Sequence, residues 1–260
     1  MVGDISKLNV KTEIVTNATM LNSQMSDGLI DAGLSCLWIS VDGFEKKAYE
    51  KIQKGAEFEL IKKNLEYFNS RRNAVKMGMT FVVMNENITE INKINQFADE
   101  MGFDYINLSY NVPAYPLKEG KSCYESGFKV GKQDRIIFGE FHNRLINYCP
   151  FIEGDNCFIK WNGDVSACMQ LLHSSYSYLF EEKREIRSKS FGNVNENKLT
   201  DIWVSDEYSQ FRKIVKEFEF PDCTICNGCD DRLSNYTDCM YNTFPTCGAC
   251  LWAQGIGRCP

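Results

Sequence analysis

Ten of the twelve cysteines lie between residues 149 and 259, and seven of these lie between residues 223 and 259. Residues 1–148 contain only Cys36 and Cys123. Disulfide frameworks are typical of short secreted chains, whereas clustered thiols at Cys-x-x-Cys spacing in a reducing compartment more often bind metal. The second half is therefore predicted to be a metal-binding domain for which the first half supplies no ligands.

Charge and hydropathy argue against two classes of partner. Lysine and arginine total 29 against 35 acidic residues, a formal net charge of −6, which does not favour nucleic-acid binding. No apolar run reaches the length of about 18 residues that a spanning helix needs, so no membrane contact is expected. The first residues, MVGDISKLNVKTE, lack the apolar core of a secretory leader. We expect a cytoplasmic protein.

Strand and helix patterns alternate in the first half, which is typical of parallel β/α units. The apolar residues of segment 57–72 recur every three or four positions, as on one face of a helix. The expected strands are 12–16, 37–41, 78–84 and 105–109, and the expected helices are about 22–33, 45–54, 57–72 and 88–101. A linking helix is expected in 131–148, between a β/α domain of residues 1–130 and a cysteine-rich domain of residues 149–260.

Polar residues follow two of the expected strands. Asn17 comes after the first strand, and Ser40 and Asp42 come at the end of the second. Parallel β/α sheets bind ligands at the carboxyl ends of their strands, so these three residues are candidate ligand-binding residues. The alternative is that they only form turns and helix caps.

The second half begins with a hairpin signal between two cysteines. Asn162-Gly163 lies between apolar residues in CFIKWNGDVSAC, a sequence that favours a β-hairpin and would bring Cys157 and Cys168 together. Cys149 lies just upstream, so three thiols are predicted to converge. Asp164 lies in the turn and is expected to be structural, and no residue is nominated as a catalytic base.

The cysteine spacing of the tail leaves two metals open. Cys223-x-x-Cys226 and Cys247-x-x-Cys250 have the spacing of a zinc site. The run that continues from Cys226 to Cys229 instead matches three ligands of a ferredoxin-type iron–sulfur motif. From spacing alone, zinc and iron–sulfur are nearly equally favoured.

The pattern of Cys149, Cys157 and WNGDVSAC, with Gly163 shortly before Cys168, resembles the opening of a SPASM domain. This domain is the auxiliary iron–sulfur module of many radical S-adenosylmethionine enzymes. The stretch GNVNENKLTDIWVSDEYSQFRK resembles the linker of that family. The tail DCMYNTFPTCGACLWAQGIGRCP resembles the branch of radical S-adenosylmethionine maturases associated with tungsten-cofactor aldehyde oxidoreductases.

The first half resembles the later part of the radical S-adenosylmethionine partial barrel, through EIVTNATML and LWISVDG. The resemblance implies an incomplete parallel (β/α) partial barrel of about four strands, followed by a small cysteine-rich SPASM-type domain with a β-hairpin. It also implies that Asn17, Ser40 and Asp42 help to hold S-adenosylmethionine.

The resemblance further implies two [4Fe–4S] clusters. Cys149, Cys157 and Cys168 would share one cluster with Cys239 or Cys229, and the remaining cysteines would supply the second. The full set of expected metal ligands is Cys149, Cys157, Cys168, Cys223, Cys226, Cys229, Cys239, Cys247, Cys250 and Cys259.

One feature of the family is not found in this sequence. No two cysteines are four residues apart, so the Cys-x-x-x-Cys-x-x-Cys motif of the cluster that cleaves S-adenosylmethionine is absent. We expect a family member without its N-terminal catalytic part, which would use S-adenosylmethionine only if that part is supplied, for example by a separate radical S-adenosylmethionine chain. The expected substrate is a peptide or a tungsten enzyme. The alternative function is a zinc-binding interaction domain without redox chemistry.

Overall fold

The computed structural model describes residues 1–84, 86–110, 136–138, 147–179, 182–224, 226, 229–244 and 247–254. The chain forms two compact units. The first comprises Met1–Asn111 with Gly120–Gly139, and the second comprises Val112–Glu119 with Glu140–Pro260.

The first unit is built on a parallel sheet with the strand order β1-β2-β3-β4-β5. Its strands are β1 (Glu13–Thr16), β2 (Cys36–Ser40), β3 (Lys76–Val83), β4 (Tyr105–Tyr110) and β5 (Ile136–Phe138). Its helices are α1 (Val2–Ser6), α2 (Ser23–Asp31), α3 (Lys46–Ile52), α4 (Phe58–Arg71), the 3₁₀ helix η1 (Ile88–Lys93) and α5 (Ile94–Met101). Neighbouring strands of a parallel sheet need crossover connections, and between β1 and β4 the helices α2 to α5 provide them.

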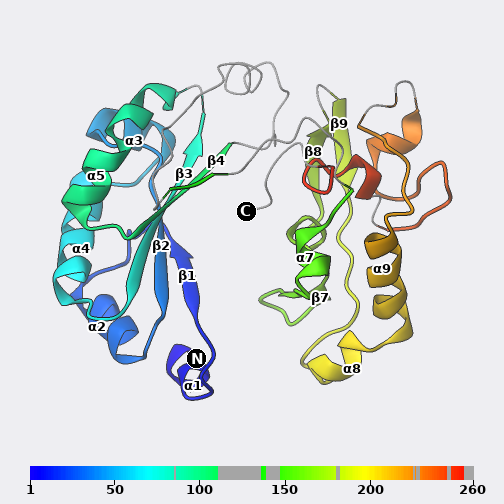
Figure 1. Cartoon of the computed structure of the whole chain (residues 1–260), viewed down its shortest axis with the longest axis horizontal. Coiled ribbons are helices and arrows are strands. Elements are labelled where there is room, and N and C mark those ends of the chain that lie inside the picture. Colours follow the sequence, from blue (N-terminus) through cyan, green and yellow to red (C-terminus); the bar gives the residue numbers. More distant parts are fainter. Residues whose placement is uncertain are drawn as a thin grey trace. The chain divides into compact units, whose positions relative to one another are not determined.

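Helices α2 to α5 lie along one side of the sheet (Figure 1). Helix α4 shows why: Phe58, Ile61, Leu65 and Phe68 are all buried, at the spacing that places them on one face. They join one core with the apolar side chains of β2, β3 and β4. Strands β1 and β2 are parallel and paired along their lengths, so their carboxyl ends lie at the same edge of the sheet.

Four expected strands and four expected helices of this unit are confirmed within a few residues, but the linking helix is wrong where it can be compared. Ile136–Phe138, expected in that helix, form β5 and pair with residues 106–108 of β4. A short apolar triplet carries no local signal that separates strand from helix. Its pairing with β4 is what makes it a strand. The sheet therefore has a fifth strand. Residues 131–135 and 139–146 lie outside the described residues.

The second unit contains short elements. Its helices are α7 (Pro150–Glu153), α8 (Leu199–Trp203) and α9 (Asp206–Glu217), with 3₁₀ helices η2 (Met169–Leu171), η3 (Asp230–Leu233) and η4 (Cys247–Ala249). Its strands are β6 (Phe158–Ile159), β7 (Val165–Ser166), β8 (Ser175–Leu179) and β9 (Glu182–Ile186), which form the antiparallel pairs β6–β7 and β8–β9. The predicted hairpin is confirmed as β6–β7.

Helix α9 organises the core of the second unit. The Ser205 side chain accepts a hydrogen bond from the Tyr208 amide and so caps the helix. Tyr208, Phe211 and Val215 are buried on one face of α9 and pack with Phe191 and other apolar residues. Cys149, Cys157 and Cys168 pack against the same core, so this helix supports the cysteine-bearing segments.

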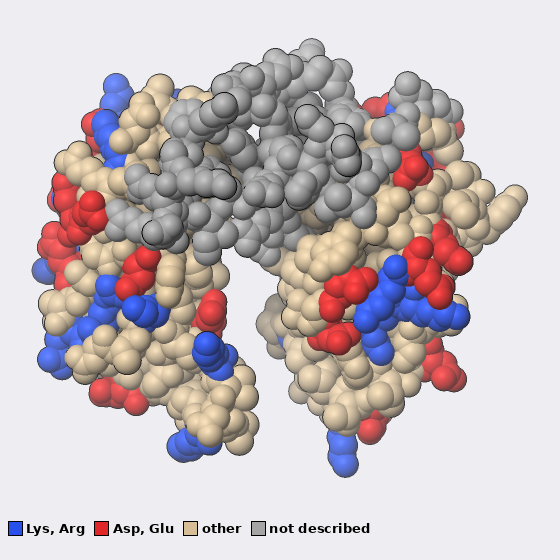
Figure 2. Space-filling model, viewed as in Figure 1, with Lys and Arg blue, Asp and Glu red and all other residues tan. Residues whose placement is uncertain are grey.

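Acidic and basic side chains are interspersed on the face shown in Figure 2, which agrees with the near balance of charges in the sequence. No helix in the described ranges is long and apolar enough to cross a bilayer.

Candidate metal centre

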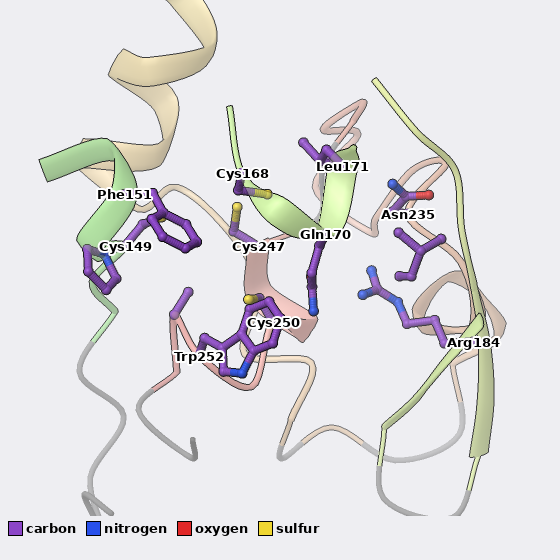
Figure 3. A pocket seen from close by; sticks show the side chains of 13 residues that line it. Cys149, Phe151, Cys168, Gln170, Leu171, Arg184, Asn235, Cys247, Cys250 and Trp252 are labelled. Carbon is purple, nitrogen blue, oxygen red and sulfur yellow. The ribbon is translucent and has the colours of Figure 1, made fainter. Parts of the chain in front are cut away.

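Four cysteines from three segments of the second unit line one pocket (Figure 3). Cys149 precedes α7, Cys168 follows β7, Cys247 begins η4 and Cys250 follows it. The pocket has a volume of about 500 Å³, part of it open to solvent. In Figure 3, the sulfur of Cys247 points toward Cys168. Four thiols around one space are the donor set that an iron–sulfur cluster uses.

The hairpin turn before Cys168 contacts the loop of residues 192–197, which has the sequence GNVNEN. Gly163 has a φ of +92°, and a Cβ at this position would lie 2.3 Å from Nδ2 of Asn195 and 2.5 Å from Oδ1 of Asn193. The side-chain amides of Asn193 and Asn195 donate hydrogen bonds of 3.0 and 2.9 Å to the carbonyl of Asn162. Only glycine accommodates both this backbone conformation and this contact. The loop therefore fixes the hairpin that carries Cys168.

Asp164 belongs to this turn. Its carboxylate accepts hydrogen bonds from Asn162 Nδ2 at 2.8 Å and from Asn193 Nδ2 at 3.0 Å. These bonds lower the pKa of the carboxyl below its usual value, and the bond from Asn162 has the largest effect. Asp164 is thus structural, as expected, since it joins the hairpin to the GNVNEN loop.

Backbone hydrogen bonds tie the Cys149 segment to the C-terminal segment. The amide of Tyr148 donates to the carbonyl of Ala253 at 2.9 Å. The amide of Cys250 donates to the carbonyl of Cys247 at 2.9 Å, which closes the turn that carries both thiols. These bonds bring Cys250 beside Cys149, although the two lie far apart in the sequence.

Burial dominates the electrostatics of the pocket thiols. Burial raises the pKa of the Cys168 thiol to about 12, and the neighbouring Cys250 adds the next largest contribution. Burial and the nearby thiols raise the pKa of Cys247 well above its usual value, and burial likewise raises the pKa of Cys250 and Cys149. In the metal-free chain these thiols keep their protons. Because thiolates are the metal-binding form, metal binding here releases protons.

Two nitrogen donors in the pocket wall suit a negatively charged occupant. Trp252 lines the pocket, and its Nε1 is buried without a hydrogen-bond partner in the described part of the chain. Arg184 also lines it, is 3% exposed, and donates from Nη2 to the Ser234 carbonyl at 3.1 Å. A buried donor costs free energy until an acceptor is present. Cluster sulfurs accept hydrogen bonds, so the residues present fit an iron–sulfur cluster.

The described cysteines do not converge on a point. No three His, Cys, Asp or Glu side chains in the described ranges are grouped closely enough to hold a single metal ion. The pocket thiols instead surround a space.

A second group of thiols lies around Cys223. Burial raises the pKa of the Cys223 thiol to about 11, Arg184 opposes this rise, and Asp238, Cys239 and Cys226 add to it. Cys226 and Cys239 are exposed. Burial lowers the pKa of Arg184, and Cys250, Cys223 and Cys247 oppose this effect. Arg184 therefore interacts with thiols of both groups. Cys229 directly precedes η3.

The structure groups the cysteines differently from the sequence-based partition. Cys247 and Cys250 were expected with the second cluster, but they line the pocket with Cys149 and Cys168, because the backbone bonds of the C-terminal segment place them there. Cys157 does not line this pocket and packs on the core beside α9. Cys259 lies outside the described residues. The ligand assignment stays a prediction.

The candidate residues of the sheet make local hydrogen bonds. The Asn17 side chain accepts from the amide and hydroxyl of Thr19, at 3.2 and 2.7 Å. The buried Asp42 carboxylate accepts from Gln53 Nε2 and from the Val82 amide, and burial raises its pKa. Ser40 ends β2, at the same edge of the sheet. A role for these three residues with S-adenosylmethionine stays a prediction.

Arg184 and Trp252 were not found from the sequence. Arg184 lies in EKREI, where nothing distinguishes it from the exposed charged residues around it. Trp252 follows Cys250 closely, and proximity to a cysteine was the one available signal.

Residues 149–230 match the family model of the SPASM iron–sulfur cluster-binding domain. This segment is a SPASM domain. The match contains six of the predicted metal ligands, namely Cys149, Cys157, Cys168, Cys223, Cys226 and Cys229. The predicted SPASM domain is thereby confirmed, and so is an iron–sulfur cluster-binding function.

A curated relative extends the similarity beyond the SPASM domain. The tungsten-containing aldehyde ferredoxin oxidoreductase cofactor-modifying protein of Pyrococcus furiosus is 28% identical over 279 residues. The alignment covers all of this chain and 78% of that protein. The resemblance to this branch, read from the tail sequence, is confirmed.

Two solved structures share the fold. SuiB of Streptococcus suis has a TM-score of 0.57 at 18% identity, over 82% of this chain and 53% of that one. The structure of anSMEcpe with bound AdoMet has a TM-score of 0.53 at 14% identity, over 86% and 64%. The chain therefore spans about half the length of SuiB. The predicted fold, a partial parallel barrel followed by a cysteine-rich SPASM domain, is confirmed.

Proposed function

We propose that this chain binds two [4Fe–4S] clusters as the auxiliary-cluster part of a radical S-adenosylmethionine maturase. The observation that carries the proposal is the pocket where Cys149, Cys168, Cys247 and Cys250 meet beside Trp252 and Arg184. It has the thiol set and the hydrogen-bond donors of one cluster. The thiols around Cys223, with Cys226 and Cys239, supply most of a second site.

The proposed substrate is a peptide or a protein that carries a metal cofactor. Two similar proteins support this: SuiB has been solved bound to the precursor peptide SuiA, and the Pyrococcus furiosus relative modifies the cofactor of a tungsten enzyme. The clusters would contact the substrate or relay electrons, and the whole enzyme would act through a 5′-deoxyadenosyl radical.

Iron and sulfide analysis tests the proposal. Protein purified without oxygen should be brown and contain about eight irons per chain, the content of two four-iron clusters. Colourless protein with stoichiometric zinc and no sulfide would overturn it in favour of the zinc-binding alternative.

A pair of cysteine variants then tests the pocket. Cys168→Ala should lose about half of the iron, because one of two clusters loses a ligand. Cys36→Ala is the matched control: Cys36 is also buried, but it lies in β2 of the first unit. Equal iron in both variants would show that Cys168 is not a ligand.

A further inference from the structure

Arg184 carries a charge on the buried side of a strand. Successive residues of a strand point to opposite faces, and in β9 Arg184 and Ile186 are buried while the other three residues are exposed. Arg184 is 3% exposed and Ile186 is 2% exposed. Burying a charge costs free energy that only opposite charge or hydrogen bonds offset, and an apolar side chain at this position would avoid that cost. The position therefore indicates a role for the charge itself.

The segment of residues 234–235 fixes the direction of this side chain. Nη2 of Arg184 donates to the Ser234 carbonyl at 3.1 Å. The Asn235 side chain, which is 1% exposed, accepts from the Arg187 amide at 2.7 Å and donates to the Arg187 carbonyl at 2.8 Å. These bonds join the segment to the end of β9, so the acceptor of Arg184 is itself held in place.

The guanidinium of Arg184 lies in the wall of the cysteine pocket. Arg184 lines this pocket together with four predicted metal ligands, namely Cys149, Cys168, Cys247 and Cys250. In Figure 3, its side chain extends from β9 toward the interior of the pocket. An arginine side chain stays positively charged in proteins. A buried positive charge therefore faces the space that the four thiols surround.

We propose that Arg184 is the counter-charge of the iron–sulfur cluster in this pocket and raises the reduction potential of that cluster. Reduction adds one electron, which makes the cluster and its thiolates more negative. A buried cation beside them stabilises the reduced state more than the oxidised one, because charges interact strongly where water is excluded. This inference rests on the proposed cluster-binding function. It gives Arg184 a role in electron uptake, outside the predicted ligand set.

Arg184→Gln tests the charge, because glutamine keeps a side-chain donor but is neutral. Iron-loaded protein is reduced stepwise with dithionite, which supplies the electron, and electron paramagnetic resonance follows the midpoint potentials of the clusters. The midpoint of the pocket cluster is the one that is missing in Cys168→Ala. We expect this midpoint to shift to a more negative value in Arg184→Gln, with the iron content retained. Arg184→Lys, which keeps the charge, should show a much smaller shift.

Arg187→Gln is the matched control. Arg187 lies just beyond the end of β9, and the variant removes the same charge from the same unit. Its side chain is 49% exposed, however, and pairs with Glu185 at 3.1 Å. Water and salt screen an exposed charge, so no midpoint should move in this variant.

An unchanged midpoint in Arg184→Gln, or equal shifts in Arg184→Gln and Arg184→Lys, would overturn the inference. If Arg184→Gln does not retain the pocket cluster, iron content takes the place of the midpoint. Arg184→Lys should then keep its iron, and loss of iron from the lysine variant as well would show that the cluster does not depend on the charge. A parent protein that binds no iron is a different result, because it contradicts the proposed function itself.

Discussion

At the scale of single residues, Gly163 is the backbone position on which the metal-binding hairpin depends most. We expect Gly163→Ala to lower the free energy of unfolding by about 2 kcal/mol or more, because the new methyl group meets Asn193 and Asn195 and the backbone conformation is unfavourable for alanine. Iron content should fall with it. Chemical denaturation of both proteins measures the difference.

Gly55→Ala is the control for that experiment. Gly55 has a similar φ of +86°, but nothing lies within 4 Å of the position a Cβ would take. This variant should lose only the backbone contribution, about 1 kcal/mol, and keep its iron. Equal losses in both variants would show that the asparagine contacts do not constrain the turn.

Cys36 predicts a pH dependence of stability. Burial, and then the charge of Glu13, raise the pKa of this 6% exposed thiol from 9.0 to about 11. The unfolded chain loses this proton first as pH rises, so the stabilising contribution is complete below pH 9 and is lost toward pH 11. It amounts to about 2 kcal/mol at most.

The Cys36→Ala variant isolates this contribution. Between about pH 8 and about pH 11, its free energy of unfolding should fall less than that of the parent, by up to about 2 kcal/mol. Parallel pH curves for the two proteins would contradict the assignment.

At the scale of elements, the two units differ in what holds them together. The parallel sheet and its helices share a large apolar core. Beyond Phe220, the helices among the described residues are the short 3₁₀ helices η3 and η4, and Cys223, Ala249 and Leu251 form a small cluster of their own. Segments with so little apolar burial usually need metal to stay folded.

Metal removal should therefore loosen the C-terminal segment first. After chelation, amide hydrogens of residues 223–254 should exchange much faster than before, while those of β2 and β3 keep their protection. Hydrogen exchange followed by mass spectrometry measures both regions in one sample. Equal protection of the two regions in metal-free protein would contradict this expectation.

At the scale of the whole molecule, we predict that this 260-residue chain by itself does not cleave S-adenosylmethionine. Cleavage in the family that it resembles uses a cluster bound by Cys-x-x-x-Cys-x-x-Cys, and no cysteines of this sequence have that spacing. Reconstituted, dithionite-reduced protein should form no 5′-deoxyadenosine above a cluster-free control. Product from the chain alone would refute the prediction, and product only after addition of a chain with the motif would favour a split enzyme.

Periodicity determined the elements, and a family resemblance predicted the type of domain. The strands from 12–16 to 105–109 and helix 57–72 follow from side-chain patterns that repeat within one element, and the hairpin follows from Asn162-Gly163. The SPASM domain was predicted from a family resemblance carried by Cys149, Cys157 and WNGDVSAC, whereas cysteine spacing alone left zinc and iron–sulfur open.

Contacts between distant segments were decided by the tertiary structure alone. Ile136–Phe138 became a strand because β4 offered a partner, and Cys247 and Cys250 joined Cys149 and Cys168 through bonds such as that from Tyr148 to Ala253. Such contacts depend on packing over long sequence separations, so no pattern within a segment encodes them. The same holds for the buried Arg184 and Trp252, which line the cysteine pocket only because the fold brings their segments beside it.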